Sequence, residues 1–260
     1  ICEYLILTPP IGNSGVSVFS SYQGAYNDRL VVFHQDTQNL YFRQRIPNSN
    51  AVGVYSVAMD GSNYREVIGG SNATHPDWEV IQFSFNQSLN KILYISDEES
   101  DDVFELYSMN LDGSNRVKLN APLAAGGSVI AFYKVPISGT NPERVVYYAD
   151  QWSDLRYDLF LANLDGSNIN GATKTNQLTM AVDSYTAGET RDVPRIQITN
   201  NGLYAVFSHT KKAFSTAGAR YYNLYSATLT GATPSIYNLT VSTAGREMYT
   251  STSWHLAPNQ

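Results

Sequence analysis

Four histidines are the side chains best suited to bind a metal ion or to move a proton near neutral pH. His34 lies at the end of the apolar run RLVVFHQ, and His209 ends the similar run LYAVFSH. If these runs are equivalent strands of different repeats, the two imidazoles approach one another at one face, as metal ligands from neighbouring repeats do. Other residue types fill the equivalent positions of the remaining repeats. We therefore favour ordinary hydrogen-bonding histidines, with no metal and no catalytic centre.

An acidic run, SDEESDD at residues 96–102, is the second candidate for chemistry. Its carboxylates would bind Ca²⁺ if the segment folded back on itself, so calcium stays open as an alternative to no cofactor. The run lacks the glycine and the alternating spacing of a dedicated calcium loop, which favours a solvated turn between two strands. Asp97 and Asp150 end equivalent apolar runs, and we expect both to cap backbone amides rather than act as acids or bases.

Serine-hydrolase chemistry needs a nucleophile on a sharp turn, typically in a Gly-X-Ser-X-Gly motif. The sequence has no such motif, and the nearest approach, GGSVI at 126–130, is typical of a loop that enters a strand. We therefore expect no hydrolase centre within these residues, and a catalytic domain outside them stays open.

Aromatic residues near predicted turns give a binding hypothesis. Trp78, Trp152, Tyr157 and Trp254 lie among Asn and Asp residues, where exposed rings stack on sugars or anchor a peptide. With the two histidines they form the predicted binding set. The competing interpretation is that most of these rings pack between sheets.

Composition limits the class of partner. The 260 residues carry a net charge of -6, and the 17 basic residues are scattered rather than clustered. No phosphate-binding stripe results, so nucleic acid is an unfavourable partner. No apolar run reaches the roughly 20 residues needed to span a bilayer. Cys2 is the only cysteine, so no internal disulfide can form.

Repeated phrases indicate how these residues are positioned. VYSVAMDGSN, LYSMNLDGSN, LFLANLDGSN and LYSATLTGAT each show strand-like alternation followed by a turn that contains glycine. They predict outer hairpins near 54–68, 106–119, 159–178 and 224–239. They recur about every 50 residues, which is the spacing of propeller blades.

Apolar runs upstream of the hairpins complete each repeat. RLVVFHQ (29–35), KILYISD (91–97), RVVYYAD (144–150) and LYAVFSH (203–209) are typical of strands buried on both faces, and a further strand-like run precedes each. Every unit therefore reads as four antiparallel strands. Such sheets bury both faces by packing around an axis, which predicts an all-β fold, a β-propeller of four-stranded blades.

The ends of the chain bear on the number of blades. EYLILT (3–8) has the pattern of an outer strand, and SWHLAPNQ (253–260) that of an opening strand. If segments 1–8 and 250–260 share a blade, residues 1–260 form a single domain of five blades, or of six if the sequence is truncated.

Residues 83–120, FSFNQSLNKILYISDEESDDVFELYSMNLDGSNRVKLN, resemble a blade of the TolB-like propellers. The shared features are a Phe-Ser strand, an Ile-aromatic-x-Ser-Asp strand, Leu-Tyr followed by Asp-Gly-Ser, and a closing Leu-Asn. The expected Pro-Asp-Gly turn is missing after the first strand. A weaker resemblance is to YWTD propellers, through YYAD at 147–150.

The TolB-like resemblance implies a bacterial, periplasmic or surface-exposed protein that serves as an interaction platform. We therefore expect a periplasmic or extracellular scaffold that binds a protein or peptide. The alternative is a carbohydrate-binding or metal-assisted, lyase-like protein, because relatives of this kind include polysaccharide lyases and propellers attached to peptidases.

Overall fold

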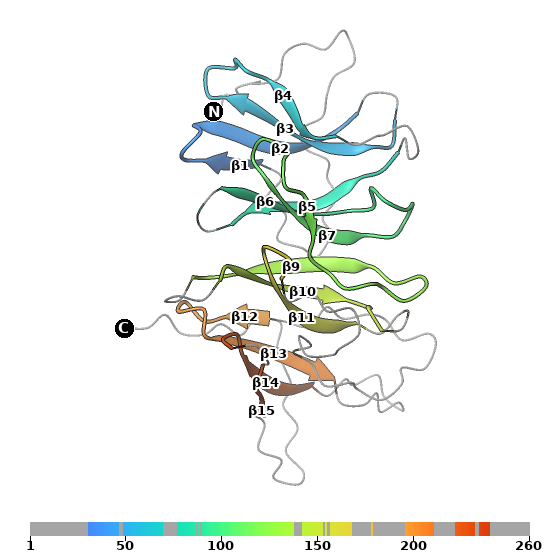
Figure 1. The fold of residues 1–260 in the computed structure, drawn as a ribbon, viewed down its shortest axis with the longest axis vertical. Coiled ribbons are helices and arrows are strands. Elements are labelled where there is room, and N and C mark those ends of the chain that lie inside the picture. Colours follow the sequence, from blue (N-terminus) through green and yellow to red (C-terminus); the bar gives the residue numbers. More distant parts are fainter. Residues whose placement is uncertain are drawn as a thin grey trace, which may run out of the picture. The chain divides into compact units, whose positions relative to one another are not determined.

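The computed structural model describes most of the chain between residues 31 and 239. The described residues are 31–46, 49–69, 77–86, 88, 90–137, 142–152, 154, 157–167, 178, 196–210, 222–231 and 234–239. Every regular element among them is a β-strand (Figure 1). The chain divides into two compact units, Ile1–Lys118 and Leu119–Gln260. The all-β prediction is confirmed for the described part of the chain.

The first unit contains two four-stranded antiparallel sheets, each with its strands in chain order. Sheet A consists of β1 (Val31–His34), β2 (Asn39–Arg45), β3 (Val52–Ala58) and β4 (Arg65–Ile68). Sheet B consists of β5 (Val80–Phe85), β6 (Lys91–Ser96), β7 (Glu105–Asn110) and β8 (Val117–Lys118).

The second unit repeats the pattern. Sheet C consists of β9 (Val129–Val135), β10 (Arg144–Ala149) and β11 (Asp158–Asn163). Leu178 donates its amide to the carbonyl of Leu159 at 2.7 Å, along the outer side of β11. Sheet D consists of β12 (Ile196–Ile198), β13 (Tyr204–Thr210), β14 (Tyr222–Thr228) and β15 (Ile236–Asn238).

A turn that contains glycine follows the third strand of every sheet, as the repeats predict, and in sheets A, B and D it leads to the fourth strand. Gly61, Gly113, Gly166 and Gly231 all have positive φ, between 74° and 88°. This backbone conformation suits glycine because a Cβ is disfavoured there. In the turn of sheet B, Asp112 Oδ1 accepts hydrogen bonds from the amide of Ser114 at 2.9 Å and from its hydroxyl at 2.6 Å. The hairpins near 54–68, 106–119 and 224–239 are confirmed.

The strand assignment in the first repeat is wrong in one respect. The run 29–35 was predicted as a central strand, but β1 is the edge strand that pairs only with β2 among the described strands. The central strand is β2, NLYFRQR, whose polar residues hide its pattern in the sequence. His34 therefore ends a first strand, whereas His209 lies on β13, the second strand of sheet D. In antiparallel order these two positions belong to opposite ends of their sheets, so the supposed equivalence of the two histidines does not hold.

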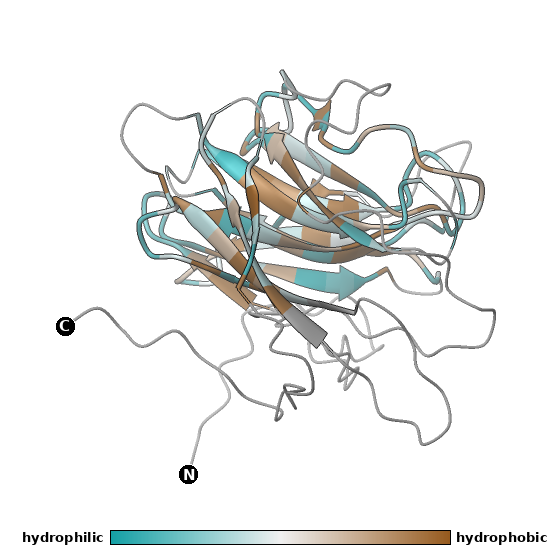
Figure 2. Ribbon diagram, turned by 90° about the horizontal axis from the view of Figure 1, so that it is seen from below, coloured by the Kyte–Doolittle hydropathy of each residue, from teal (hydrophilic) through white to brown (hydrophobic). Residues whose placement is uncertain are grey.

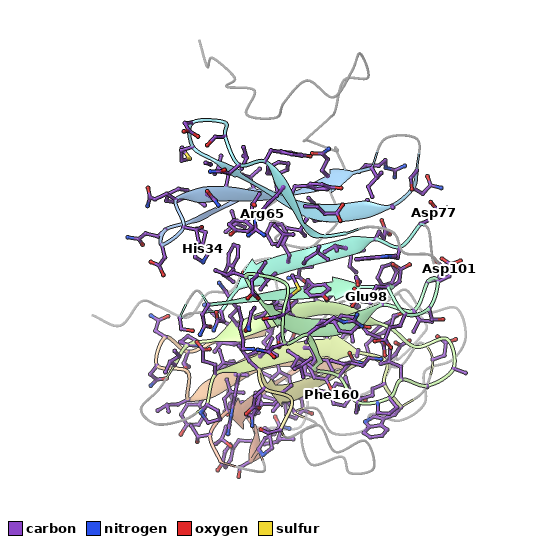
Figure 3. All side chains as sticks on the ribbon, turned by 45° about the horizontal axis from the view of Figure 1, so that its top comes forward. His34, Arg65, Asp77, Glu98, Asp101 and Phe160 are labelled. Atoms are coloured by element: carbon purple, nitrogen blue, oxygen red, sulfur yellow. The ribbon has the colours of Figure 1, made fainter. Side chains whose placement is uncertain are left out.

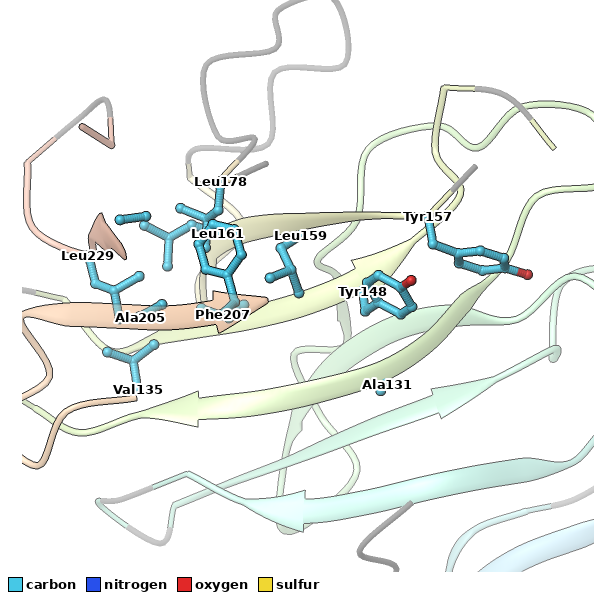
Figure 4. Close-up of a cluster of buried hydrophobic side chains, with 12 residues drawn as sticks. Ala131, Val135, Tyr148, Tyr157, Leu159, Leu161, Leu178, Ala205, Phe207 and Leu229 are labelled. Carbon is cyan, nitrogen blue, oxygen red and sulfur yellow. The ribbon is translucent and has the colours of Figure 1, made fainter. Parts of the chain in front are cut away.

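Each unit has its own apolar core between its two sheets. In the first unit Tyr41, Val54 and Ile68 of sheet A pack with Phe83, Phe85 and Tyr94 of sheet B. In the second unit residues of sheet C, including Tyr148 and Leu159, pack with Phe207 and Leu229 (Figure 4). Apolar residues lie mainly on the strands, and polar residues are concentrated in the turns (Figure 2). The terminal segments 1–8 and 250–260 lie outside the described residues, so ring closure and the number of blades stay predictions.

Candidate functional site

Two aspartates fix the ends of the central strands. Asp97 follows β6, and its Oδ1 accepts a hydrogen bond from the amide of Glu79 at 2.7 Å, just before β5. Asp150 follows β10, and its Oδ1 accepts from the amide of Ser128 at 2.5 Å, just before β9. Both carboxylates thus join the end of a second strand to the start of the first. The prediction that they cap backbone amides is confirmed.

A stacked aromatic pair occupies the same place in all four sheets. One ring lies on the second strand and the other directly opposite on the third, with ring centroids 5.2–6.5 Å apart and interplanar angles of 19–27°. Such pairs add stability beyond the area that they bury. They are Phe42–Tyr55, Tyr94–Tyr107, Tyr147–Phe160 and Phe207–Tyr225. We call these four stacked pairs the aromatic platform.

Charged residues surround this platform in sheet B. Tyr94 donates its hydroxyl to Glu98 Oε1 at 3.2 Å, and Arg116 Nε lies 2.9 Å from the same oxygen. The Glu98 side chain is 7% exposed and that of Arg116 is 44% exposed, so the ion pair is open to solvent on the arginine side. The Arg116 guanidinium also lies 4.8 Å from the centroid of the Tyr107 ring, which adds a cation–π contact.

Lys118 continues the network towards the start of β7. Its Nζ lies 2.7 Å from Glu99 Oε2 and 2.7 Å from Glu105 Oε2. Tyr107 donates its hydroxyl to Glu105 Oε2 at 3.0 Å. Arg116 Nη2 also donates to Glu99 Oε1 at 2.7 Å. The three glutamates and two cations thus form one continuous network, which we call the strand-end network.

Burial and pairing shift the titration of these groups in opposite directions. Burial raises the pKa of Glu98 above its ordinary value, and Arg116 only partly opposes this. Burial also acts to raise the pKa of Glu99, but the hydrogen bonds from Lys118 and Tyr107 and the charges of Lys118 and Arg116 together outweigh it, and the net pKa is lowered. Burial and the adjacent Glu105 raise the pKa of Tyr107, so its phenol stays protonated as a donor.

In sheet A, different residues surround the aromatic ring of the third strand. Tyr64 stacks on Tyr55 with centroids 5.6 Å apart, where sheet B has Arg116 over Tyr107. Tyr55 donates its hydroxyl to Glu66 Oε2 at 3.0 Å, and Tyr64 donates to Gln44 Oε1 at 2.9 Å. The aromatic platform is thus common to both sheets, while the groups around it differ.

Two members of the predicted binding set lie in the core of the first unit. His34 is 1% exposed, and its ring is 4.7 Å from the ring of Phe85. Its Nδ1 accepts a hydrogen bond from the amide of Thr37 at 3.2 Å, which assigns it a role in a turn. Trp78 is 5% exposed and packs in the core between sheets A and B. Figure 3 places His34 and Glu98 on opposite sides of this unit.

The other predicted residues belong to the second unit. Tyr157 is buried and stacks on Tyr148 with centroids 5.2 Å apart (Figure 4). Trp152 is partly exposed, and its ring centroid lies 6.2 Å from that of Phe160. Trp254 and the side chain of His209 lie outside the described residues. Whether any of the six binds a ligand stays a prediction.

Sequence reasoning missed Arg116, Lys118 and Gln151. Arg116 and Lys118 are two residues apart on and beside an outer strand, which suggests one face, but their carboxylate partners follow only from the strand register. In the described part of the chain, no three His, Cys, Asp or Glu side chains are grouped as a metal site would require. Nor does any helix long and apolar enough to span a membrane occur in that part.

Comparison with known proteins finds similar structures but no match to a known sequence family. No protein-family model matches the chain, and no curated protein matches it. The crystal structure of Porphyromonas gingivalis dipeptidyl peptidase 4 is similar over 78% of this chain, with a TM-score of 0.52 and 14% identity. A putative TolB from Agrobacterium tumefaciens is similar over 82%, with a TM-score of 0.45 and 13% identity. Prolyl oligopeptidase B from Galerina marginata is similar over 79%, with a TM-score of 0.46 and 13% identity.

The chain spans only part of each of these proteins. It covers 25% of either peptidase and 64% of the putative TolB. At such identity the likeness concerns the fold alone. The repeated antiparallel sheets and the likeness to the propeller of dipeptidyl peptidase 4 lead to one conclusion: this chain is an all-β protein built from the four-stranded blades of a β-propeller.

Proposed function

We propose that this chain is a TolB-like propeller that binds a protein or peptide partner and acts as a scaffold rather than an enzyme. The repeated motif of residues 83–120 supports the TolB-like assignment, which also implies a periplasmic or extracellular location. Because the chain covers only part of its structural neighbours, an activity outside these residues is a separate question.

The observation that carries the proposal is the charged surface of the turn between β6 and β7. Glu99, Asp101 and Asp102 are all exposed on this turn. The turn is held by hydrogen bonds from the amides of Ser100 and Val103 to the carbonyls of Asp97 and Ser100, at 3.2 and 3.0 Å. Asp97 Oδ2 also accepts from the amide of Asp102 at 3.3 Å. A fixed acidic surface is complementary to a basic partner and steers its approach.

The buried carboxylates of the same region support binding over catalysis. Asp97, Glu98 and Glu105 each accept hydrogen bonds from neighbouring protein groups. A general acid or base must instead reach a substrate proton within hydrogen-bonding distance. The arrangement is therefore typical of a structural network that supports an exposed turn.

The test is a binding titration with three capped peptides of equal length, one basic, one acidic and one neutral. We expect the basic peptide to bind most tightly and to weaken as salt is added, because exposed charges are screened. The combined variant Glu99→Gln, Asp101→Asn and Asp102→Asn should weaken its binding. The matched control is Asp60→Asn, which removes an exposed carboxylate from the Asp-Gly turn of sheet A. Equal binding by the turn variant and the wild type would remove this surface from the proposal.

A carbohydrate-binding or lyase-like function is the alternative, and the partly exposed Trp152 favours it. An indole at the edge of a polar loop can stack on a sugar ring. Titration with acidic and neutral oligosaccharides separates the two functions, since binding or cleavage of an oligosaccharide without peptide binding would replace the scaffold proposal.

A further inference from the structure

Sheet D exposes two tyrosines on one of its faces. Tyr204 is 42% exposed and Tyr237 is 53% exposed. On the strand between them, Tyr204 lies opposite Thr228, and Tyr237 lies opposite Ser226. Because residues two apart on a strand point to the same side, the two tyrosines share a face of the sheet, which we call the tyrosine face. Large apolar side chains that are exposed together mark an interaction surface.

The tyrosine face is directed away from the core of the second unit. Phe207, Ala227 and Ile236 lie on the other side of sheet D, where they pack with residues of sheet C. The tyrosines are therefore on the side that sheet C leaves open. Their rings are accessible to a ligand without any movement of the core.

The strands of sheet D differ from those of the other sheets in charge. β12, β13, β14 and β15 contain no Asp, Glu, Lys or Arg, although the whole chain has a net charge of -6. The strands of sheets A, B and C all include charged residues, such as Arg43, Lys91 and Arg144. A surface without charge offers no complementary partner to a charged ligand, so the tyrosine face favours a neutral one.

Short side chains with hydroxyl groups lie between the two tyrosines. Ser226 and Thr228 are partly exposed on β14, the strand between β13 and β15. Thr228 Oγ1 accepts the amide of Ser235 at 2.8 Å and keeps its own proton for donation. Serine is depleted in protein–protein interfaces, so these residues speak against a protein partner. Aromatic rings beside hydroxyl groups suit a ligand that has both apolar faces and hydroxyls, as a sugar does.

The strand register sets the distance between the tyrosines. They are two strands apart across the sheet and two residues apart along it, so their Cα atoms lie about 12 Å apart at ordinary strand spacing. This separation suits several linked sugar rings better than a single one. Tyr204 is also fixed in place, because Thr199 Oγ1 accepts its amide at 3.1 Å and the Thr199 amide donates to its carbonyl at 2.9 Å. A contact surface that is already ordered loses little freedom on binding.

We infer that the tyrosine face of sheet D binds a neutral oligosaccharide or polysaccharide. Sugar rings stack on Tyr204 and Tyr237, and their hydroxyls form hydrogen bonds with Ser226 and Thr228 between them. This goes beyond the proposed function, because it concerns another class of ligand and a separate surface, and it does not depend on peptide binding.

The test is calorimetric titration with neutral hexasaccharides of β-1,4-linked glucose, xylose and mannose, and with a hexasaccharide of galacturonic acid as the charged probe. The proteins are the wild type, Tyr204→Ala, Tyr237→Ala, Tyr237→Phe and Phe33→Ala. Phe33 is the matched control, because its ring is 47% exposed on β1 of sheet A. Thermal unfolding shows whether each variant is folded, and sedimentation at several protein concentrations reports self-association.

We expect at least one neutral hexasaccharide to bind, and the charged one to bind more weakly. Each alanine variant should weaken this binding about tenfold, the effect of one lost stacking contact. Tyr237→Phe keeps the ring and should lose less than Tyr237→Ala, and Phe33→Ala should bind as the wild type does.

Three results would overturn this inference: no binding of any neutral hexasaccharide, wild-type affinity in both alanine variants, or an equal loss in Phe33→Ala. A dimer that dissociates in Tyr237→Ala and excludes the sugar would assign the face to a second copy of the chain and overturn it as well. The combined variant of Glu99, Asp101 and Asp102 should bind the hexasaccharide as the wild type does. The proposed function and this inference therefore fail separately.

Discussion

Replacing Arg116 by methionine isolates the electrostatic part of the strand-end network. Arg116 Nε lies 2.9 Å from Glu98 Oε1. Two unit charges about 4 Å apart interact by about 1 kcal/mol in water and by about 4 kcal/mol at an effective dielectric constant of about 20. Because Arg116 is 44% exposed while Glu98 is nearly enclosed, the lower half of this range applies. We expect Arg116→Met to lower the free energy of unfolding by about 2 kcal/mol at neutral pH.

The pH dependence of this loss follows from Glu98. Burial already raises the pKa of Glu98 in the folded protein, and Arg116 partly opposes that rise. Without the arginine, the pKa rises further above its unfolded value. A carboxyl group of this kind takes up a proton more readily in the folded state, so protonation favours folding. The loss should therefore be complete at neutral pH and should shrink as the pH falls through the raised pKa of Glu98.

The assay is denaturant unfolding of four proteins: the wild type, Arg116→Met, Glu98→Gln and the double variant. Glu98→Gln alone should change stability by less than about 1 kcal/mol, because Arg116 is open to solvent and still pairs with Glu99. The double variant should recover most of what Arg116→Met loses, because no buried charge is left unpaired. A loss that is the same at low pH, and the same with glutamine at position 98, would refute this reasoning. The stability would then come from packing of the arginine stem over Tyr107.

Three further outcomes test the scaffold. Gly113→Ala should lower the free energy of unfolding by roughly 1–2 kcal/mol, because φ is 88° at this position and a side chain strains the backbone there. No neighbouring atom lies within 4 Å of the added Cβ, so this strain acts alone. Asp97→Ala and Asp150→Ala should each lower the free energy of unfolding by about 1–3 kcal/mol, because each leaves a backbone amide without its acceptor. An equal loss in Asp60→Ala would contradict that cause. Millimolar calcium should leave thermal unfolding unchanged, because Asp97 already accepts two backbone amides; a clear rise in melting temperature would revive the calcium alternative.

The repeat predicted the parts of the fold that depend on local chemistry. Glycine after aspartate gives the turn, and the period of two gives the strands on either side of it, so the hairpin at Asp112 and Gly113 needs no distant contact. Asp97 and Asp150 were also predictable, because a carboxylate at the end of a buried strand must find donors nearby.

The order in which strands pair and the long-range partners of side chains could not be predicted from the local pattern. Strand β2 carries Arg43 and Gln44, whose polar character lowers the apolar signal, while the apolar β1 resembles a central strand. Arg43 is accommodated because its Nη1 donates to the carbonyl of Ile81 in sheet B at 2.6 Å. Burial of Trp78 likewise depends on two sheets packing together. Such contacts join residues far apart in sequence, and local periodicity carries no information about them.

The four sheets separate what holds the blade together from what can recognise a partner. The aromatic pair is common to all of them, and in sheets B and C the strand-end aspartate and the hydrogen bond from the second-strand tyrosine are also shared. The residue that accepts this hydrogen bond is Glu98 in one sheet, where it pairs with Arg116, and Gln151 in the other. Since the tyrosine hydroxyl is satisfied by either residue, the charge at this position can differ from blade to blade while the aromatic pair and the strand-end aspartate stay the same.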